Sequence, residues 1–133
     1  MTRWMLDTNT VSYAAHRRSA PLVSRLVETP TEALCVSSVS YGESRYGLAH
    51  RRSRALEVAL ADFFQEVKVL PWTQHTALVY GDLRAAMRQI GRSLQPLDML
   101  IAAHALEAGA VLVSSDAAFR HVPGLTVEDW TAA

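Results

Sequence analysis

The sequence predicts an α/β three-layer sandwich in which a mostly parallel sheet of four to five strands is flanked by helices. Short apolar segments alternate along the chain with longer segments of helical periodicity, a pattern typical of βαβ units. The short segments are apolar nearly throughout, as in strands that are covered on both faces. No repeat, linker or low-complexity segment interrupts the 133 residues, so we expect a single domain over residues 1–133.

Five apolar segments are the candidate strands. The first is Trp4-Met5-Leu6, which leads directly into Asp7. The second is followed by a pair of serines and the third by Pro71, residues that favour turns over a continuing strand. The four later segments span residues 34–36, 67–70, 110–113 and 125–127.

Segments with helical character lie between these strands. Thr73 is placed to cap the segment of residues 74–90 and Gly91 to end it, and Gly109 is placed to end the segment that begins at Pro96. Ser40 and Glu43 have the spacing of a capping box, which predicts a helix from about residue 39 that Gly47 could loosen. The other predicted helices span residues 11–16, 21–28, 52–66, 74–90 and 96–108.

The composition excludes several classes of protein. Half of the residues are hydrophobic and a fifth are charged, which is a globular composition rather than a disordered one. Cys35 is the only cysteine, so a disulfide framework and a cysteine-based zinc site are excluded. The N-terminus lacks a signal-peptide pattern and no segment has the length of a membrane span, so we expect a cytoplasmic protein.

Thirteen basic and thirteen acidic residues give a net charge of zero, so the net charge does not indicate a nucleic-acid partner. Twelve of the basic residues are arginines, whose guanidinium groups suit phosphate but also suit surface carboxylates. Arg17 and Arg18 are adjacent, and a second cluster lies at residues 51–54. For each cluster, a nucleic-acid contact and a solvated helix face both remain open.

Four acids stand at element boundaries that a parallel sheet would bring to one edge. Asp7 follows the first strand, Glu43 follows the second, and Asp116 follows the fourth. Asp98 lies in the first turn of the helix that leads into the fourth strand. Open α/β sheets bind ligands at the carboxyl ends of their strands, so we expect the four carboxylates to form one site.

Each acid also has a simpler explanation. Asp7 and Asp116 could cap short helices, Glu43 could belong to the capping box, and Asp98 could answer the helix dipole. Crowded carboxylates raise one another's pKa, and a divalent cation relieves this repulsion; ligands that are all oxygen select Mg²⁺ or Mn²⁺. None of the five histidines has zinc-site spacing, and His104 is predicted to be a buried core residue or a partner of the site.

The order of these motifs resembles that of PIN-domain nucleases. It is similar in particular to the VapC ribonuclease toxins of bacterial VapBC toxin–antitoxin pairs. Three positions depart from the pattern: Ser93 follows Gly-Arg where proline is common, Ser114 replaces threonine, and Arg45 replaces an apolar residue. The resemblance covers the whole chain and rests on the runs Met5-Leu6-Asp7-Thr8-Asn9, Val36-Ser37-Ser38-Val39 with Glu43, Gly91-Arg92 with Asp98, and Leu112-Val113-Ser114-Ser115-Asp116.

This resemblance implies a PIN-like fold and an Mg²⁺-dependent endoribonuclease toxin, in which a metal-activated water cleaves RNA to leave a 5′-phosphate and a 3′-hydroxyl. It implies one or two Mg²⁺ ions, with Mn²⁺ as a substitute, and tRNA as a candidate target. A VapB-type antitoxin would inhibit the toxin, and a homodimer and a larger complex with the antitoxin are expected. The implied catalytic and metal-binding residues are Asp7, Glu43, Asp98 and Asp116; Thr8, Asn9 and Ser114 would support them or meet phosphate; Arg92, Arg17 and Arg18 are candidate RNA contacts.

Two other functions also fit acids at one edge of a parallel sheet. A receiver-like phosphoacceptor domain also gathers acids at the edge of a parallel sheet, but it requires paired acids after the first strand and a lysine after the last, which this chain lacks. A PIN fold kept only as a binding module would have lost site acids, and all four are present.

The helices of residues 39–66 carry a surplus of large apolar side chains. This surplus predicts a groove for an antitoxin helix, a homodimer contact, or both. A plain helical hairpin packed on its own sheet is the alternative. The side chains are Tyr41, Tyr46, Leu48, Leu56, Leu60, Phe63 and Phe64.

Overall fold

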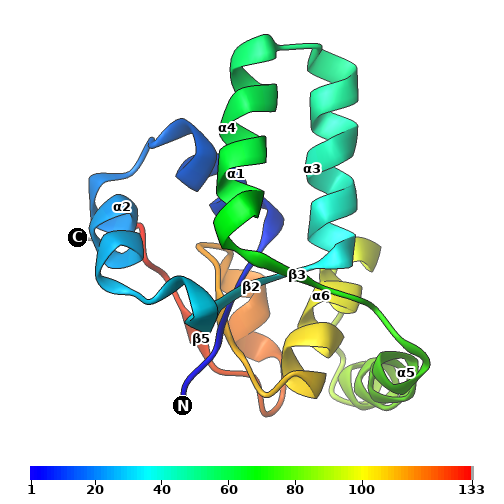
Figure 1. Cartoon of the computed structure of the whole chain (residues 1–133). Helices are drawn as coiled ribbons and strands as arrows, with labels where there is room; N and C mark the ends of the chain where they lie inside the picture. Colours follow the sequence, from blue (N-terminus) through cyan, green and yellow to red (C-terminus); the bar gives the residue numbers. More distant parts are fainter. Residues whose placement is uncertain (133) are drawn as a thin grey trace.

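The computed structural model describes residues 1–132 and contains a five-stranded sheet of order β3-β2-β1-β4-β5 (Figure 1). Every neighbouring pair of strands is parallel, which confirms the predicted parallel sheet. The strands are β1 (Trp4–Leu6), β2 (Leu34–Ser37), β3 (Lys68–Leu70), β4 (Val111–Val113) and β5 (Val127–Glu128).

Helices cover both faces of this sheet, so the predicted three-layer sandwich is confirmed. Met5, Cys35 and Leu112 pack on one face with buried residues of α5 and α6. Their chain neighbours Leu6 and Val113 point to the other face, where α1, α2, α3 and α4 supply the core. The helices are α1 (Thr8–His16), α2 (Ala20–Glu28), α3 (Ser38–Arg51), α4 (Arg54–Glu66), α5 (Gln74–Gln89) and α6 (Pro96–Glu107), with short 3₁₀ helices η1 (Thr31–Ala33) and η2 (Ala117–His121).

Helices α3 and α4 form a hairpin that extends away from the sheet (Figure 1). Gly47 does not loosen α3, which continues to Arg51. The chain then reverses at Arg52, whose φ of 51° is left-handed, and the side chain of Ser53 caps α4 by accepting from the N–H of Leu56 at 3.2 Å. The left-handed residue Arg52 and the Ser53 cap, rather than Gly47, therefore separate α3 from α4.

Three predicted boundaries were wrong. The capping box of Ser40 and Glu43 does not form, because Ser37 caps α3 and Ser40 is buried inside it. Helix α1 begins at Thr8 rather than near Val11, because the cap formed by Asp7 organises residues 8–10 into the first helical turn. The last strand is Val127–Glu128 rather than residues 125–127, because its ladder with β4 pairs Leu112 with Val127.

The strand order reverses direction at β1. Strands β2 and β3 are added on one side of β1, and β4 and β5 are added on the other. Such a reversal leaves a crevice at the carboxyl ends of the two central strands, because the connections leave them in opposite directions. The first residues beyond β1 and β4, Asp7 and Ser114, therefore lie at the place where this fold class binds ligands.

Within residues 1–132, none of the helices combines the length and apolar character needed to cross a bilayer.

Candidate active site

Asp7 is buried at the end of β1 and is held by bonds to two other elements, β4 and α1. Its N–H donates to the carbonyl of Val113 at 3.1 Å, which continues the β1–β4 ladder, and its Oδ1 accepts from the N–H of Thr10 at 2.9 Å. Burial raises the pKa of Asp7, opposed by hydrogen bonds from Ser114 and Thr10, and the charge of Asp116 raises it further. The predicted helix cap is therefore confirmed. Asp7 is also only 5% exposed and lies near the charge of Asp116, which a capping role alone does not require.

Glu43 lies on α3 beside the first turn of α1. The hydroxyl of Thr8 donates to its Oε1 at 2.6 Å. Asn9 is exposed and lines, with Thr8 and Glu43, a cavity of about 160 Å³ between α1 and the α3–α4 hairpin. The segment Asp7-Thr8-Asn9 thus supplies one acid and holds a second acid in position.

Asp98 is half-buried in the first turn of α6, as predicted. Burial raises its pKa to about 6, and the negative charges of Asp116, Glu43 and Asp7 add to the shift in that order. Because a charge acts in this way only over short range, Asp98 lies among the other three carboxylates. The structure therefore brings all four predicted acids together.

Asp116 is the exposed member of this cluster. It caps η2, its Oδ1 accepting from the N–H of Ala118 at 2.9 Å, so the predicted cap is again correct. Its own N–H donates to the Oγ of Ser114 at 3.0 Å. Ser114 is buried and also bonds Asp7, so one hydroxyl links the ends of β1 and β4.

Within residues 1–132, none of the four carboxylates forms an ion pair with a basic side chain. Among residues 1–132 the ion pairs are Arg25–Glu128 and Arg54–Glu57, and neither includes a site acid. Four carboxylates without a basic partner, two of which (Asp7 and Asp98) have raised pKa values, are a donor set that suits a hard divalent cation such as Mg²⁺.

The carboxylates are nevertheless not arranged as a closed metal centre. In the described part of the chain, no three groups from histidine, cysteine, aspartate or glutamate lie close enough to hold one ion. The hydrogen bonds explain the separation, because Thr10 holds Asp7, Thr8 holds Glu43 and the N–H of Ala118 holds Asp116.

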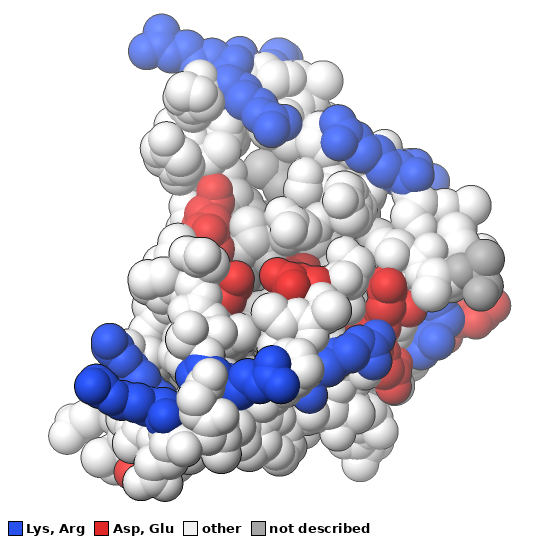
Figure 2. All heavy atoms as spheres, turned by 180° about the vertical axis from the view of Figure 1, so that it is seen from behind, with Lys and Arg blue, Asp and Glu red and all other residues white. Residues whose placement is uncertain are grey.

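On one face of the molecule, acidic side chains lie in and around a hollow that is bordered above and below by basic side chains (Figure 2). Of the arginines predicted as RNA contacts, Arg92 lies on the exposed loop between α5 and α6, beside Arg84 and Arg88, which the sequence analysis missed. Arg18 lines a shallow hollow with Ser115, the neighbour of Asp116. Arg17 instead lines an apolar groove on α1, α2 and α4.

A buried Ser37–His104 pair holds the helices that carry Glu43 and Asp98. The Nδ1 of His104 on α6 lies 2.7 Å from the Oγ of Ser37, which caps α3 by accepting from Val39. Burial lowers the pKa of His104, opposed by the charge of Glu107 and by the Pro71 carbonyl. The prediction of a buried, satisfied histidine is confirmed.

Together, the fold and this site define an α/β domain with an uncompensated acidic centre at its topological switch point. The model of the PIN domain family matches residues 4–125. Ribonuclease VapC2 of Haemophilus influenzae is 32% identical over 98% of this chain and 99% of its own length. The tRNA(fMet)-specific endonuclease VapC of Salmonella typhimurium is 30% identical over 98% of this chain and 99% of its own length.

The structural comparison agrees with these matches. The DNA-bound VapBC complex of Salmonella typhimurium contains a chain that superposes with a TM-score of 0.85 at 32% identity, covering 98% of this chain and 99% of that one. The chain therefore belongs to the PIN-domain family, and within it to the VapC ribonucleases.

Proposed function

We propose that this protein is the toxin of a VapBC pair and acts as a metal-dependent endoribonuclease. The observation that carries the proposal is the cluster of Asp7, Glu43, Asp98 and Asp116, which lies at the switch point without a neutralising cation. The membership in the VapC ribonucleases supports RNA as the substrate class. A receiver-like phosphoacceptor is disfavoured because its sheet has the order 2-1-3-4-5, whereas this sheet has the order 3-2-1-4-5.

Magnesium is the cofactor that the donor set suits. Bound at this cluster, Mg²⁺ would supply positive charge to the scissile phosphate and acidify a water for attack, giving a 5′-phosphate and a 3′-hydroxyl. Asp7 is fixed most firmly of the four acids, since backbone and side-chain bonds from two elements hold it. Asp98 and Glu43 lie on helices on either side of it, and Asp116 completes the cluster from η2.

Transfer RNA is the candidate substrate, because a relative of this length and similarity is named a tRNA(fMet)-specific endonuclease. Arg84, Arg88 and Arg92, exposed on α5 and on the loop after it, would provide contacts for the phosphates of such a substrate.

A VapB-type antitoxin is the proposed inhibitor. An apolar groove is present, but other residues line it than the sequence predicted. Leu48, Leu56 and Leu60 are buried in the core instead. Of the seven predicted side chains, only Phe63 lines the groove. The groove lies between α4 and the pair α1 and α2, has a volume of about 560 Å³, and includes Val58. Its size and apolar walls suit an amphipathic helix of the antitoxin. A homodimer remains part of the proposal, and the exposed Tyr46 on α3 is available for it.

The decisive experiment compares single carboxylate-to-amide variants. Asp7→Asn and Asp98→Asn should keep the fold but abolish RNA cleavage and growth inhibition, while Asp116→Asn should retain residual activity. Asp82→Asn, an exposed acid on α5, is the matched control and should cleave like the unchanged protein. Full cleavage by a folded Asp7→Asn variant in Mg²⁺ would disprove the assignment.

Thermal unfolding tests the metal separately. Mg²⁺ that binds only the folded cluster should add about 2.7 kcal/mol at 100 times its Kd. The Asp7→Asn/Asp98→Asn variant should lose most of this response. Equal shifts in both proteins would show that the ions act elsewhere.

A further inference from the structure

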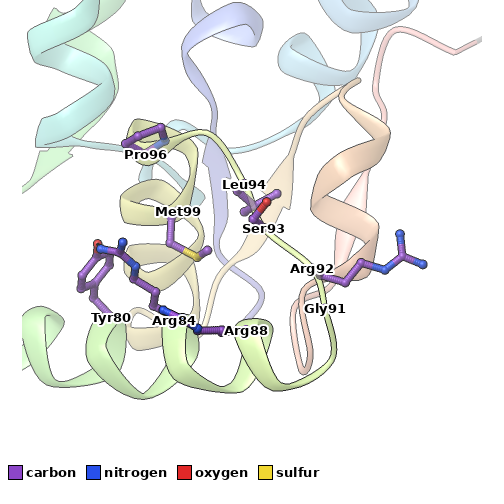
Figure 3. Close-up of a pocket in the computed structure, with 9 residues that line it drawn as sticks. All are labelled: Tyr80, Arg84, Arg88, Gly91, Arg92, Ser93, Leu94, Pro96 and Met99. Carbon is purple, nitrogen blue, oxygen red and sulfur yellow. The ribbon is translucent and has the colours of Figure 1, made fainter.

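A cavity of about 410 Å³ opens between α5, α6 and the loop that joins them (Figure 3). Tyr80, Arg84 and Arg88 come from α5, Pro96 and Met99 come from α6, and Arg92 lies on the loop. None of the site acids lines this cavity, so it is a feature separate from the acidic cluster.

The lining of the cavity is positively charged, although the protein as a whole has no net charge. Residues 83–97 contain three arginines and no acid, although the whole chain has a net charge of zero. All three arginines are exposed, and the ion pairs of residues 1–132 leave each of them without a carboxylate partner. The four-residue spacing of Arg84 and Arg88 places these two on one side of α5, and Arg92 follows on the loop after the helix ends.

The backbone fixes the last of these arginines. Gly91 has a left-handed φ of 71°, and the N–H groups of Gly91 and Arg92 donate to the carbonyls of Arg88 at 3.1 Å and Met87 at 2.9 Å. This pair of bonds is a Schellman motif, which ends α5 and holds Arg92 at a defined position. The guanidinium of Arg92 points away from Arg84 and Arg88, so the charges extend along the surface instead of meeting at one point (Figure 3).

The wall of the cavity is apolar and partly aromatic. The Tyr80 hydroxyl accepts from the Nη1 of Arg84 at 2.9 Å, and the ring of Tyr80 packs edge-on against Trp72 with centroids 6.0 Å apart. Met99 is buried and its side chain is directed into the cavity (Figure 3). Guanidinium groups along a groove with an aromatic wall form the arrangement that binds single-stranded nucleic acid, since phosphates pair with the cations and a base stacks on the ring.

The cavity and the acidic cluster share one helical turn. Pro96 and Met99 face the cavity, whereas Asp98, between them in sequence, lies among the other site acids. A strand whose cleaved phosphate lies at the acids is therefore adjacent to the cavity.

We propose that the α5–α6 cavity is a nucleotide subsite, in which Arg84, Arg88 and Arg92 hold phosphates of the RNA strand beside the cleaved bond and an unpaired base stacks against Tyr80. The subsite rests on the proposed ribonuclease function and adds to it the recognition of an unstacked nucleotide. It predicts a preference for loops over continuous duplexes, because a paired base cannot enter the cavity.

The test measures binding of fluorescein-labelled bacterial tRNA by anisotropy, in EDTA so that cleavage is suppressed. The Arg84→Gln/Arg88→Gln/Arg92→Gln variant should bind at least tenfold more weakly in 0.1 M salt, because three phosphate contacts are lost. The slope of its plot of log K against log salt concentration should become less steep by roughly two to three units. Arg3→Gln is a single-charge control at the opposite, amino edge of the sheet and should leave both quantities nearly unchanged.

Tyr80→Leu separates base stacking from charge, and it should weaken binding by a similar factor at every salt concentration. The triple variant binding and cleaving tRNA like the unchanged protein would overturn the subsite and leave the ribonuclease function intact. An unchanged protein that cleaves neither tRNA nor other bacterial RNA, with or without Mg²⁺, would overturn the function itself. If the triple variant lost affinity only for the antitoxin, the arginines would bind an acidic peptide. If ATP saturated the cavity of the unchanged protein without an effect on tRNA binding, they would bind a free nucleotide. Either outcome overturns the proposal.

Discussion

Thr8 donates its hydroxyl to the Oε1 of Glu43 at 2.6 Å, and this bond joins the first turn of α1 to α3 across the acidic site. Residues that orient a metal-ligating carboxylate are worth about 10- to 100-fold in metal affinity or activity. We therefore expect Thr8→Val to lower the RNA cleavage rate by about that factor and to raise the Mg²⁺ concentration needed for half-maximal rate. Thr8→Ser keeps the hydroxyl and should stay close to the unchanged protein. If both variants responded equally to Mg²⁺, the bond would have no role in positioning Glu43.

Asp98 should make the stability of the metal-free protein depend on pH. Its pKa is raised to about 6 by burial and by the neighbouring acids, so the folded protein holds this proton more tightly than the unfolded chain. The stabilisation is complete below the ordinary pKa of 3.8 and is lost as the pH rises through about 6. His104 acts in the opposite sense because its pKa is lowered, so the comparison must be made against Asp98→Asn at each pH.

Urea unfolding in EDTA between pH 4 and 7.5 measures this effect. The unfolding free energy of the unchanged protein, minus that of Asp98→Asn, should fall as the pH rises. A difference that is flat across this range would show that neither burial nor the other three acids raise the pKa of Asp98.

The Ser37–His104 pair is predicted to stabilise the fold without taking part in the chemistry. His104→Ala removes a buried ring and leaves the Ser37 hydroxyl without this partner, so the unfolding free energy should fall by about 2–4 kcal/mol. Ser37→Ala loses a helix cap and should cost about 1–2 kcal/mol. In a double-mutant cycle the two effects should be clearly less than additive, because both changes remove the same bond. Additive losses would show that the 2.7 Å contact contributes nothing.

The sequence was sufficient for the strands and for the acidic cluster because both depend on local patterns. An apolar segment followed by Asp7 predicts a buried strand and an acid at its end, and parallel pairing then brings Asp7 and Asp116 to the same edge. The spacing of Ser40 and Glu43 was misleading, since it fits a capping box although the bonds of Ser37 to Val39 and His104 fix the start of α3. That contact with His104 spans 67 positions of the chain and leaves no local trace.

The cavities were beyond sequence reasoning for a related reason. The four-residue spacing of Arg84, Arg88 and Arg92 is visible in the sequence, but the apolar wall opposite them depends on how α6 packs on α5. Likewise, the surplus of large apolar residues in residues 39–66 was correctly noticed but not correctly placed. Burial of Leu56 and Leu60 in the core left the groove to α1, α2 and the other side of α4.

The final prediction concerns competition between the antitoxin and the metal. The tail of the cognate VapB-type antitoxin, docked in the α1–α2–α4 groove, could extend through the small cavity that reaches Glu43 and place a basic side chain among the uncompensated carboxylates. A cation and a basic side chain would then compete for the same charges, so calorimetric titration of the tail should give weaker binding as Mg²⁺ rises. Val58→Asp, in the groove, should weaken binding equally with and without Mg²⁺, whereas Asp98→Asn should remove most of the Mg²⁺ dependence. Identical affinities for the unchanged protein in EDTA and in Mg²⁺ would rule out insertion into the site while leaving the groove as the docking surface.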